Sequence, residues 1–270
     1  MLIGLRERLN KNIYRKILKQ MRAYDLVVDG TENIPESPVI YAVHHGGIAD
    51  IPNIIEAIPD YAVLLAGKDN IDFASKCLLF LAGTVFVNRK DKDDRRKAKQ
   101  KLIRVLRKGR SIIIFPEGTW NLSPSKLHLP LTWGGIDIAR KAGVAIVPVA
   151  QEYFYEESVL DGKEHIQKVH IRFGTPVQPS VAGSIEEQLA QLEGAFATVR
   201  WSILEEQTLT GRAEIPDMYY QNYIQSKINS FPGDIEAEEQ YIYGASDEFY
   251  QYFWLNIAQC DAQGRIVRKK

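Results

Sequence analysis

Short apolar runs alternate with helix-periodic segments along most of the chain. Runs rich in Val, Ile and Leu predict strands at 26–29, 38–43, 62–66, 84–87, 111–115, 144–150 and 169–173. Apolar residues that recur every three or four positions predict helices near 49–58, 70–80, 91–108, 133–142 and 184–208. Because strands and helices alternate, we predict an α/β domain over residues 25–208, with a central, mostly parallel sheet flanked by helices.

The two ends of the chain differ from this domain in pattern and charge. Residues 1–24 combine an apolar stripe that includes Leu2, Leu5 and Leu9 with seven basic residues and one acid, Glu7. This pattern predicts an amphipathic helix, which either lies on an anionic membrane or packs on the domain with a solvated basic face. Residues 209–270 are acidic and rich in tyrosine, and we predict an α-helical C-terminal extension with helices near 215–229 and 246–259.

The charge of the chain limits the kinds of binding partner that can be expected, and its cysteine content indicates the cellular compartment. The 34 basic and 34 acidic residues cancel overall, yet segment 89–110 holds twelve basic residues against three acidic ones. This basic face either attracts an anionic surface or is merely solvated. A nucleic-acid partner is not predicted, since no aromatic side chains interleave with the charges. Only Cys77 and Cys260 are present, which favours a reducing, cytoplasmic compartment.

The apolar runs of the sequence are too short to predict a membrane-spanning segment. No run approaches the roughly 18 apolar residues that a transmembrane helix needs. The N-terminus also lacks the compact apolar region and small-residue cleavage site of a signal peptide. We therefore expect any contact with a membrane to be peripheral, on its inner, cytoplasmic face.

The most informative segment follows the predicted strand 38–43 and reads His44-His45-Gly46-Gly47-Ile48-Ala49-Asp50. The carboxyl ends of strands are where α/β sheets bind ligands. If a helix begins just before Asp50, the loop brings the imidazole of His45 over that carboxylate. Such a pair can remove a proton from a hydroxyl, with histidine as general base and the carboxylate fixing its tautomer. Because no serine or cysteine lies beside the pair, the activated hydroxyl is expected to belong to a substrate.

Two further segments lie at predicted strand ends. Strand 84–87 runs into Arg89, and guanidinium is the preferred bidentate partner of phosphate. Strand 111–115 runs into Pro116-Glu117-Gly118-Thr119, a sharp turn whose N–H groups and Thr119 hydroxyl could bind phosphate or glycerol oxygens. Taken singly, the histidine–aspartate spacing and a surface arginine are both weak signals.

Together, and in this order, the three segments resemble the glycerol-phosphate and lysophosphatidate acyltransferase family. The family carries a histidine–x4–aspartate motif, a glycine-to-arginine strand and a phenylalanine-proline-glutamate-glycine-threonine turn. The strand 144–149 with its central Pro148, and the helix-like segment 133–143 before it, are similar to family features as well. The resemblance covers roughly residues 25–180.

The resemblance implies a glycerol-phosphate acyltransferase-like fold and a role for each matched residue. His45 would be the general base and Asp50 its orienting partner. Arg89 would bind the acceptor's phosphate, with Lys68 near the same pocket. The acceptor site would be lined by Glu117, Gly118 and Thr119.

Three positions depart from the family pattern. Trp120 stands where an arginine commonly follows the threonine, which removes a possible phosphate contact and supplies an aromatic wall. Asn88 precedes Arg89 where aspartate is common, and Gly46-Gly47-Ile48-Ala49 lacks the frequent hydroxyl-bearing residue. These departures leave room for an acceptor other than lysophosphatidate.

The resemblance implies an acyltransferase that moves a fatty acyl group from acyl-CoA or acyl carrier protein to the hydroxyl of lysophosphatidate or a related lysolipid. The expected partners are therefore the lysolipid, the acyl donor and a membrane surface, with no cofactor and no metal. A zinc site built from His44, His45 and Asp50 is a weaker alternative, because adjacent histidines rarely converge on one metal. A non-catalytic lipid-binding protein and a thioester hydrolase are the rival functions.

Overall fold

The computed structural model describes residues 24–207, apart from 37, 48, 69–72, 122–125 and 156–165, together with 233, 259–260 and 266–267. The predicted N-terminal amphipathic helix lies outside the described residues, except for its last residue, Tyr24. The predicted helices of the C-terminal extension do so too, except for their last residue, Gln259. The domain boundaries at 24 and 208 therefore stay predictions.

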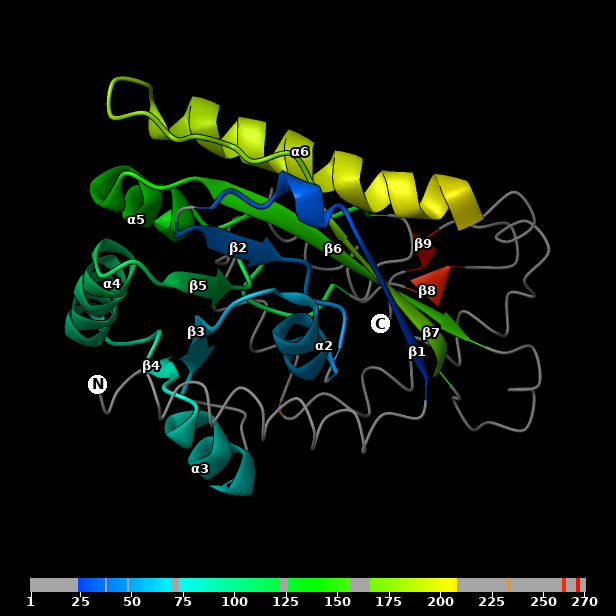
Figure 1. The fold of residues 1–270 in the computed structure, drawn as a ribbon, viewed down its shortest axis with the longest axis horizontal. Helices are drawn as coiled ribbons and strands as arrows, with labels where there is room; N and C mark the ends of the chain where they lie inside the picture. Colours follow the sequence, from blue (N-terminus) through cyan, green and yellow to red (C-terminus); the bar gives the residue numbers. More distant parts are fainter. Residues whose placement is uncertain are drawn as a thin grey trace.

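A seven-stranded sheet forms the centre of the fold, with strand order β1-β7-β6-β2-β5-β3-β4 (Figure 1). All neighbouring pairs are parallel except β6–β7, which are antiparallel. The strands are β1 (Asp25–Asp29), β2 (Ile40–Val43), β3 (Ala62–Gly67), β4 (Val85–Val87), β5 (Ser111–Ile114), β6 (Ile146–Tyr155) and β7 (Ile166–Phe173). The mostly parallel α/β sheet predicted from the sequence is confirmed.

Among the described residues, five helices cover the two faces of this sheet, and a short 3-10 helix, η1 (Thr31–Asn33), follows β1. They are α2 (Asp50–Ala57), α3 (Phe73–Leu81), α4 (Lys92–Arg107), α5 (Gly134–Ala142) and α6 (Ile185–Gln207). Each begins and ends within three residues of its predicted bounds. None of the helices within these described ranges has both the length and the apolar character needed to cross a bilayer.

Alternation of side chains along the strands divides the core into two layers. On β2, Ile40 and Ala42 pack with residues of α4, α5 and α6, whereas Tyr41 and Val43 pack with residues of α2 and α3. Successive strand residues point to opposite faces, so a buried strand must be apolar at every position. This explains the continuous apolar runs of the sequence and places the carboxyl ends of β2, β3, β4 and β5 along one edge.

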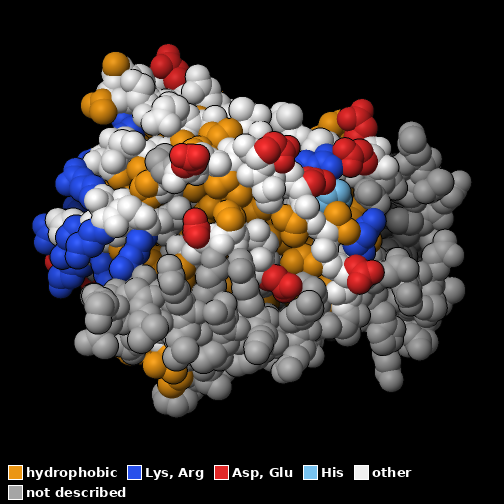
Figure 2. All heavy atoms as spheres, in the orientation of Figure 1, with side chains coloured by type: hydrophobic (Ala, Val, Ile, Leu, Met, Phe, Trp, Pro, Cys, Tyr) orange, Lys and Arg blue, Asp and Glu red, His pale blue; other side chains and the backbone are white. Residues whose placement is uncertain are grey.

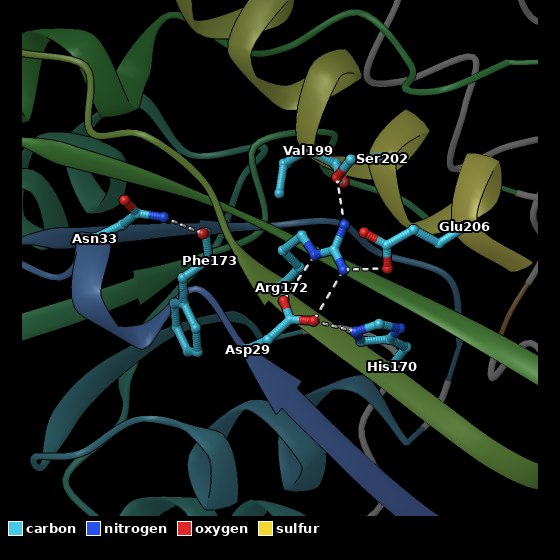
Figure 3. A network of polar contacts seen from close by, with 8 residues as sticks. All are labelled: Asp29, Asn33, His170, Arg172, Phe173, Val199, Ser202 and Glu206. Atoms are coloured by element: carbon cyan, nitrogen blue, oxygen red, sulfur yellow. Dashed lines mark hydrogen bonds and ion pairs between the residues drawn. The ribbon is translucent and has the colours of Figure 1, made fainter.

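A polar network joins the far edge of the sheet to α6 (Figure 3). Arg172 on β7 donates to Asp29 on β1 through Nε at 2.7 Å and Nη2 at 2.9 Å. Its guanidinium also reaches Ser202 at 2.9 Å and Glu206 at 2.6 Å, both on α6. His170 contacts the same aspartate at 2.6 Å. The strand pair β1–β7 is thereby tied to the helix that crosses it.

The described part of the C-terminal extension differs from its prediction. Strands β8 (Gln259–Cys260) and β9 (Ile266–Val267) form a short antiparallel pair separate from the main sheet. The sequence predicts only helix here. A two-residue strand leaves no periodic pattern, so nothing in the sequence marks it.

Candidate active site

The loop between β2 and α2 brings His45 and Asp50 into direct contact. Nδ1 of His45 lies 2.7 Å from Oδ2 of Asp50. Because an ionised carboxylate only accepts hydrogen bonds, Nδ1 carries the hydrogen and donates it. The other ring nitrogen, Nε2, is then left with a lone pair that can take a proton. The imidazole is 19% exposed and the carboxylate is fully buried, so a substrate can reach the base but not its partner.

Asp50 is held by donors on both of its oxygens. Oδ2 also accepts from the backbone N–H groups of Gly46 at 2.7 Å and Gly47 at 2.8 Å. Oδ1 accepts from the hydroxyl of Tyr153 on β6. Asp50 is the first residue of α2, where the helix dipole favours a negative charge. These donors compensate the cost of burying the carboxylate and fix the position of the His45 ring.

The turn after β5 is bonded to the backbone of the same loop. Oε2 of Glu117 accepts from the N–H of His45 at 2.8 Å, and Oε1 accepts from the N–H of Leu129 at 2.9 Å. Glu117 is fully buried. Burial raises its pKa to about 8, while the two N–H donors and the charge of Arg200 act in the opposite direction. The Glu117 side chain therefore links the backbone of His45 to that of Leu129.

Aromatic side chains and one more backbone bond surround the His45 ring. The Phe115 ring lies 4.3 Å from it between centroids, and the Trp120 ring meets it edge-on at 6.1 Å. The N–H of Asn121 donates to the carbonyl of His45 at 2.6 Å. Trp120, the departure from the family pattern, is thus part of the wall beside the base.

Arg89 lies at the same edge of the sheet and contacts the Glu117-Gly118 turn. Its Nη1 donates to the carbonyl of Gly118 at 2.8 Å. A Cβ added to Gly67, at the end of β3, would lie 3.4 Å from its Nε, so the guanidinium passes close over that backbone. His45 and Arg89 are therefore joined to successive residues of one turn.

The remaining predicted site residues lie on the same edge with different surroundings. Lys68 follows β3, and its ammonium, 49% exposed, pairs with Asp94 near the start of α4 at 2.7 Å. Thr119 is buried, and its hydroxyl makes no hydrogen bond with the described residues. Thr119 therefore has an unused donor and acceptor close to the turn, whereas the Lys68 ammonium is already engaged by a carboxylate.

The adjacent His44 contacts β6 rather than Asp50. It is buried, and its Nδ1 lies 3.2 Å from the carbonyl of Gln151 on β6. Burial, with the nearby charge of Arg200, holds the pKa of His44 well below its ordinary value, so the ring is neutral. Within the described residues, no group of three His, Cys, Asp or Glu side chains is placed to hold a metal ion.

Three functional contacts were not predicted from the sequence: those of Tyr153, Asn121 and Leu129. Tyr153 lies 103 positions from the carboxylate it binds. Leu129 and Asn121 act through backbone N–H groups, which any residue but proline supplies. A sheet with β6 next to β2 brings Tyr153 to the site, and no local pattern could show this pairing.

Part of the chain is similar in sequence to known acyltransferases. Residues 25–152 match the family model described as Acyltransferase. A 1-acyl-sn-glycerol-3-phosphate acyltransferase of Borreliella burgdorferi is 36% identical over 137 residues, which are 50% of this chain and 54% of that protein. A lyso-ornithine lipid O-acyltransferase of Pseudomonas aeruginosa is 31% identical over 121 residues, 44% of this chain and 45% of that protein. The chain thus spans about half the length of these curated relatives.

A solved structure extends the likeness to the fold. The 1-acyl-sn-glycerophosphate (LPA) acyltransferase of Thermotoga maritima superposes with a TM-score of 0.56 and 24% identity. The match covers 76% of this chain and 81% of that structure. Residues 25–152, which carry His45, Asp50, Arg89 and the Glu117 turn, are thus similar in sequence to the acyltransferase family.

Proposed function

We propose that this protein is an acyltransferase that moves a fatty acyl group from acyl-CoA or acyl carrier protein to the hydroxyl of lysophosphatidate or a related lysolipid. One observation carries the proposal. The His45 imidazole is oriented by buried Asp50, and its backbone is bonded to the Glu117 turn that Arg89 contacts. His45 and Arg89, the proposed base and the proposed phosphate-binding cation, thus contact one turn at the same edge of the sheet. Relatives named as acyltransferases for glycerol-phosphate and ornithine lysolipids support the same reaction class.

His45 provides the proton transfer that this reaction needs. Its Nε2 removes the hydroxyl proton as the acceptor oxygen attacks the thioester carbonyl carbon. When the tetrahedral intermediate collapses, the carbon–sulfur bond breaks and the thiolate takes the proton back from the imidazolium. Asp50 stabilises the imidazolium while it exists. We propose that neither a metal nor a bound cofactor takes part, since acyl-CoA or acyl carrier protein is consumed as a co-substrate.

Arg89 and the turn 117–119 are the proposed site for the acceptor's polar head. A guanidinium beside a turn offers charge-assisted hydrogen bonds to a phosphate. Trp120 replaces a possible second cation with an aromatic wall, which reduces the positive charge near the phosphate. The acceptor class therefore includes lysophosphatidate and lysolipids whose head carries less charge.

The substrates also imply a place for the protein. Lysolipids reside in bilayers, so the proposed location is the cytoplasmic face of a membrane, with the chain bound peripherally. Figure 2 shows Lys and Arg side chains gathered over α4 at one end of the molecule. Such a surface suits anionic lipid headgroups.

A panel of lysolipid acceptors tests the proposal directly. Wild-type protein is given one acyl thioester with each acceptor, and both released thiol and acylated product are measured. His45→Ala should lower turnover by about 10²–10⁴-fold, the usual contribution of general-base catalysis. Its circular dichroism spectrum should stay unchanged, because the ring is partly exposed.

The same panel separates the rival functions. Thiol release without acceptor, giving free fatty acid, would indicate a hydrolase in which His45 activates water. Lipid binding without any turnover would indicate a non-catalytic protein. Near-full turnover by His45→Ala on an accepted substrate would exclude the proposed mechanism.

A further inference from the structure

A buried guanidinium on α6 reaches the loop that supports the active site. Arg200 is 6% exposed. Its Nη1 donates to the carbonyl oxygens of Lys126 at 2.7 Å and Leu127 at 2.9 Å. Its Nε donates to the carboxylate of Glu152 on β6. Arg200 lies outside residues 25–152, so the family match does not include it.

The loop that Arg200 holds is bonded in turn to both polar groups of the His45 backbone. Asn121 donates through its side chain to the carbonyl of Lys126 at 3.1 Å and through its N–H to the carbonyl of His45 at 2.6 Å. Leu129 donates to Glu117 at 2.9 Å, and Glu117 accepts from the N–H of His45 at 2.8 Å. Two chains of hydrogen bonds thus run from residues 126–129 to the catalytic histidine.

We propose that Arg200 is a positioning residue for His45, acting through the 126–129 loop, Asn121 and Glu117. The inference rests on the proposed acyl transfer. Without this cation, the carbonyl groups of Lys126 and Leu127 lose a charge-assisted donor, and the loop can shift away from α6. A displacement of about 1 Å at a catalytic group can cost about 10²-fold in rate. The side chain therefore affects the chemical step without touching the substrate.

The positive charge of Arg200 also affects the active site, because it influences the pKa of Glu117. Glu117 faces Asp50 on α2, the His45 loop, and Arg200 on α6. Asp50 raises its pKa and Arg200 lowers it. Arg200 itself faces Glu152 on β6 and lies near His44. Loss of this cation should raise the Glu117 pKa further and change the pH dependence of turnover on the alkaline side.

A second arginine that contacts the same helix provides the matched control. Arg172 binds Ser202 and Glu206 of α6, as Figure 3 shows, but its other partner, Asp29, lies on β1 at the far edge of the sheet. Replacing it should loosen α6 without disturbing the 126–129 loop. If the loss of activity came from looser packing of α6, variants of both arginines would show it. If it came from a displaced His45, only the Arg200 variant would show it.

The test compares Arg200→Met, Arg200→Lys and Arg172→Met with wild type. We expect Arg200→Met to lower kcat by about 10–100-fold, with a smaller change in KM for the lysolipid and a shifted pH profile of kcat. Arg200→Lys should recover part of the loss, because an ammonium keeps the charge and can hold one carbonyl. Arg172→Met should lower Tm by a similar amount to Arg200→Met while keeping kcat within about twofold. Equal kcat losses in Arg200→Met and Arg172→Met would overturn the inference, as would an unchanged kcat in Arg200→Met.

A readout without substrate separates this inference from the proposed function. The ring ¹H–¹⁵N signals of His45 in NMR spectra, assigned with His45→Ala, should move in Arg200→Met and Arg200→Lys but stay in place in Arg172→Met. If wild type transfers no acyl group to any acceptor, the proposed function fails while these signals still report on Arg200. Unmoved His45 signals in Arg200→Lys would overturn the inference even if Arg200→Met does not fold.

Discussion

Asp50 divides its donors between its two oxygens, with the imidazole and two backbone N–H groups on one and Tyr153 on the other. Tyr153→Phe removes a single hydroxyl and leaves the ring in place. The carboxylate then loses a buried donor, which costs about 1–3 kcal/mol. We predict a lower Tm and a kcat reduced by about tenfold, less than for His45→Ala. Steady-state kinetics with calorimetry measures both, and an unchanged kcat would show that the backbone donors orient Asp50 alone.

Glu117 makes the stability of the protein depend on pH. Its pKa rises from 4.5 to about 8 in the folded state. Between these values the folded chain holds a proton that the unfolded chain has released, so stability falls as pH increases. The contribution is fully present below about pH 4.5 and is lost as pH passes through about 8. We predict a Tm that decreases from pH 5 to pH 8.

Glu117→Gln isolates this contribution, because an amide of similar size does not titrate. The decrease in Tm over that pH range should become smaller in the variant. Activity should also fall at every pH, since an amide places an NH2 group, which cannot accept, where one of the two carboxyl oxygens accepts from His45 or Leu129. A variant whose Tm changes with pH as steeply as that of wild type would assign the dependence to another group.

The sequence predicts the site's residues better than it predicts their partners. His45 and Asp50 are five positions apart, so a loop and the start of a helix are enough to place them together. The contacts of Glu117 with His45 and Leu129, by contrast, depend on β2 and β5 being neighbours. Arg200 is still harder to predict, because its proposed role depends on how α6 crosses β6. A single sequence carries no signal for such long-range contacts.

At the scale of elements, the local periodicity of the sequence predicts where helices and strands lie along the chain. It does not predict which strands are neighbours in the sheet. β6 is predicted to end at Ala150 and continues to Tyr155, beyond the apolar run. Its extra residues pair antiparallel with β7, for example Tyr153 with Val169. That extension carries Tyr153 and Glu152, two residues that support the site. The polar residues of this extension are explained by the groups that they contact, and they do not mark the end of the strand.

The end of α5 gives a test of backbone geometry that is independent of the site. Gly143 follows the helix in the left-handed region at φ 72°, and a Cβ there would meet no atom within 4 Å. Gly143→Ala should therefore destabilise by about 1 kcal/mol through backbone strain alone. Gly134, at the start of the same helix, also has open space around it but does not have a positive φ. Gly134→Ala should be neutral or stabilising by up to about 0.5 kcal/mol.

Thermal unfolding of both variants measures the difference, and kcat should match wild type in each. Gly143→Asn is the milder version of the first change, because asparagine tolerates the left-handed region better than alanine does. Equal Tm values for the Gly143→Ala and Gly134→Ala variants would mean that the loop after α5 relaxes at no cost.

At the scale of the whole molecule, a neutral chain carries a strongly asymmetric surface. α4 buries Ala98, Leu102 and Leu106 against the sheet and exposes most of its Lys and Arg residues. Figure 2 shows the resulting cluster of basic side chains at one end of the described surface. The helix is also capped by Asp91, whose carboxylate accepts from the N–H groups of Asp93 and Asp94. The basic residues are therefore exposed on a helix that is stabilised by its buried face and by its N-terminal cap.

This surface predicts binding to anionic membranes that depends on salt. Lys97, Lys101 and Arg104 lie on one exposed stripe of α4 at spacings of four and three residues. A basic residue near an anionic bilayer contributes about 1 kcal/mol, so changing all three to Gln should weaken binding to phosphatidylglycerol vesicles by about 100-fold. Sedimentation with vesicles measures the partition coefficient, and phosphatidylcholine vesicles provide the uncharged control. Because the three side chains are solvated, Tm and the kcat on a short-chain, monomeric lysolipid should stay at wild-type values. Binding that is equal for both vesicle types, or unchanged in the triple variant, would assign membrane association to a different part of the chain.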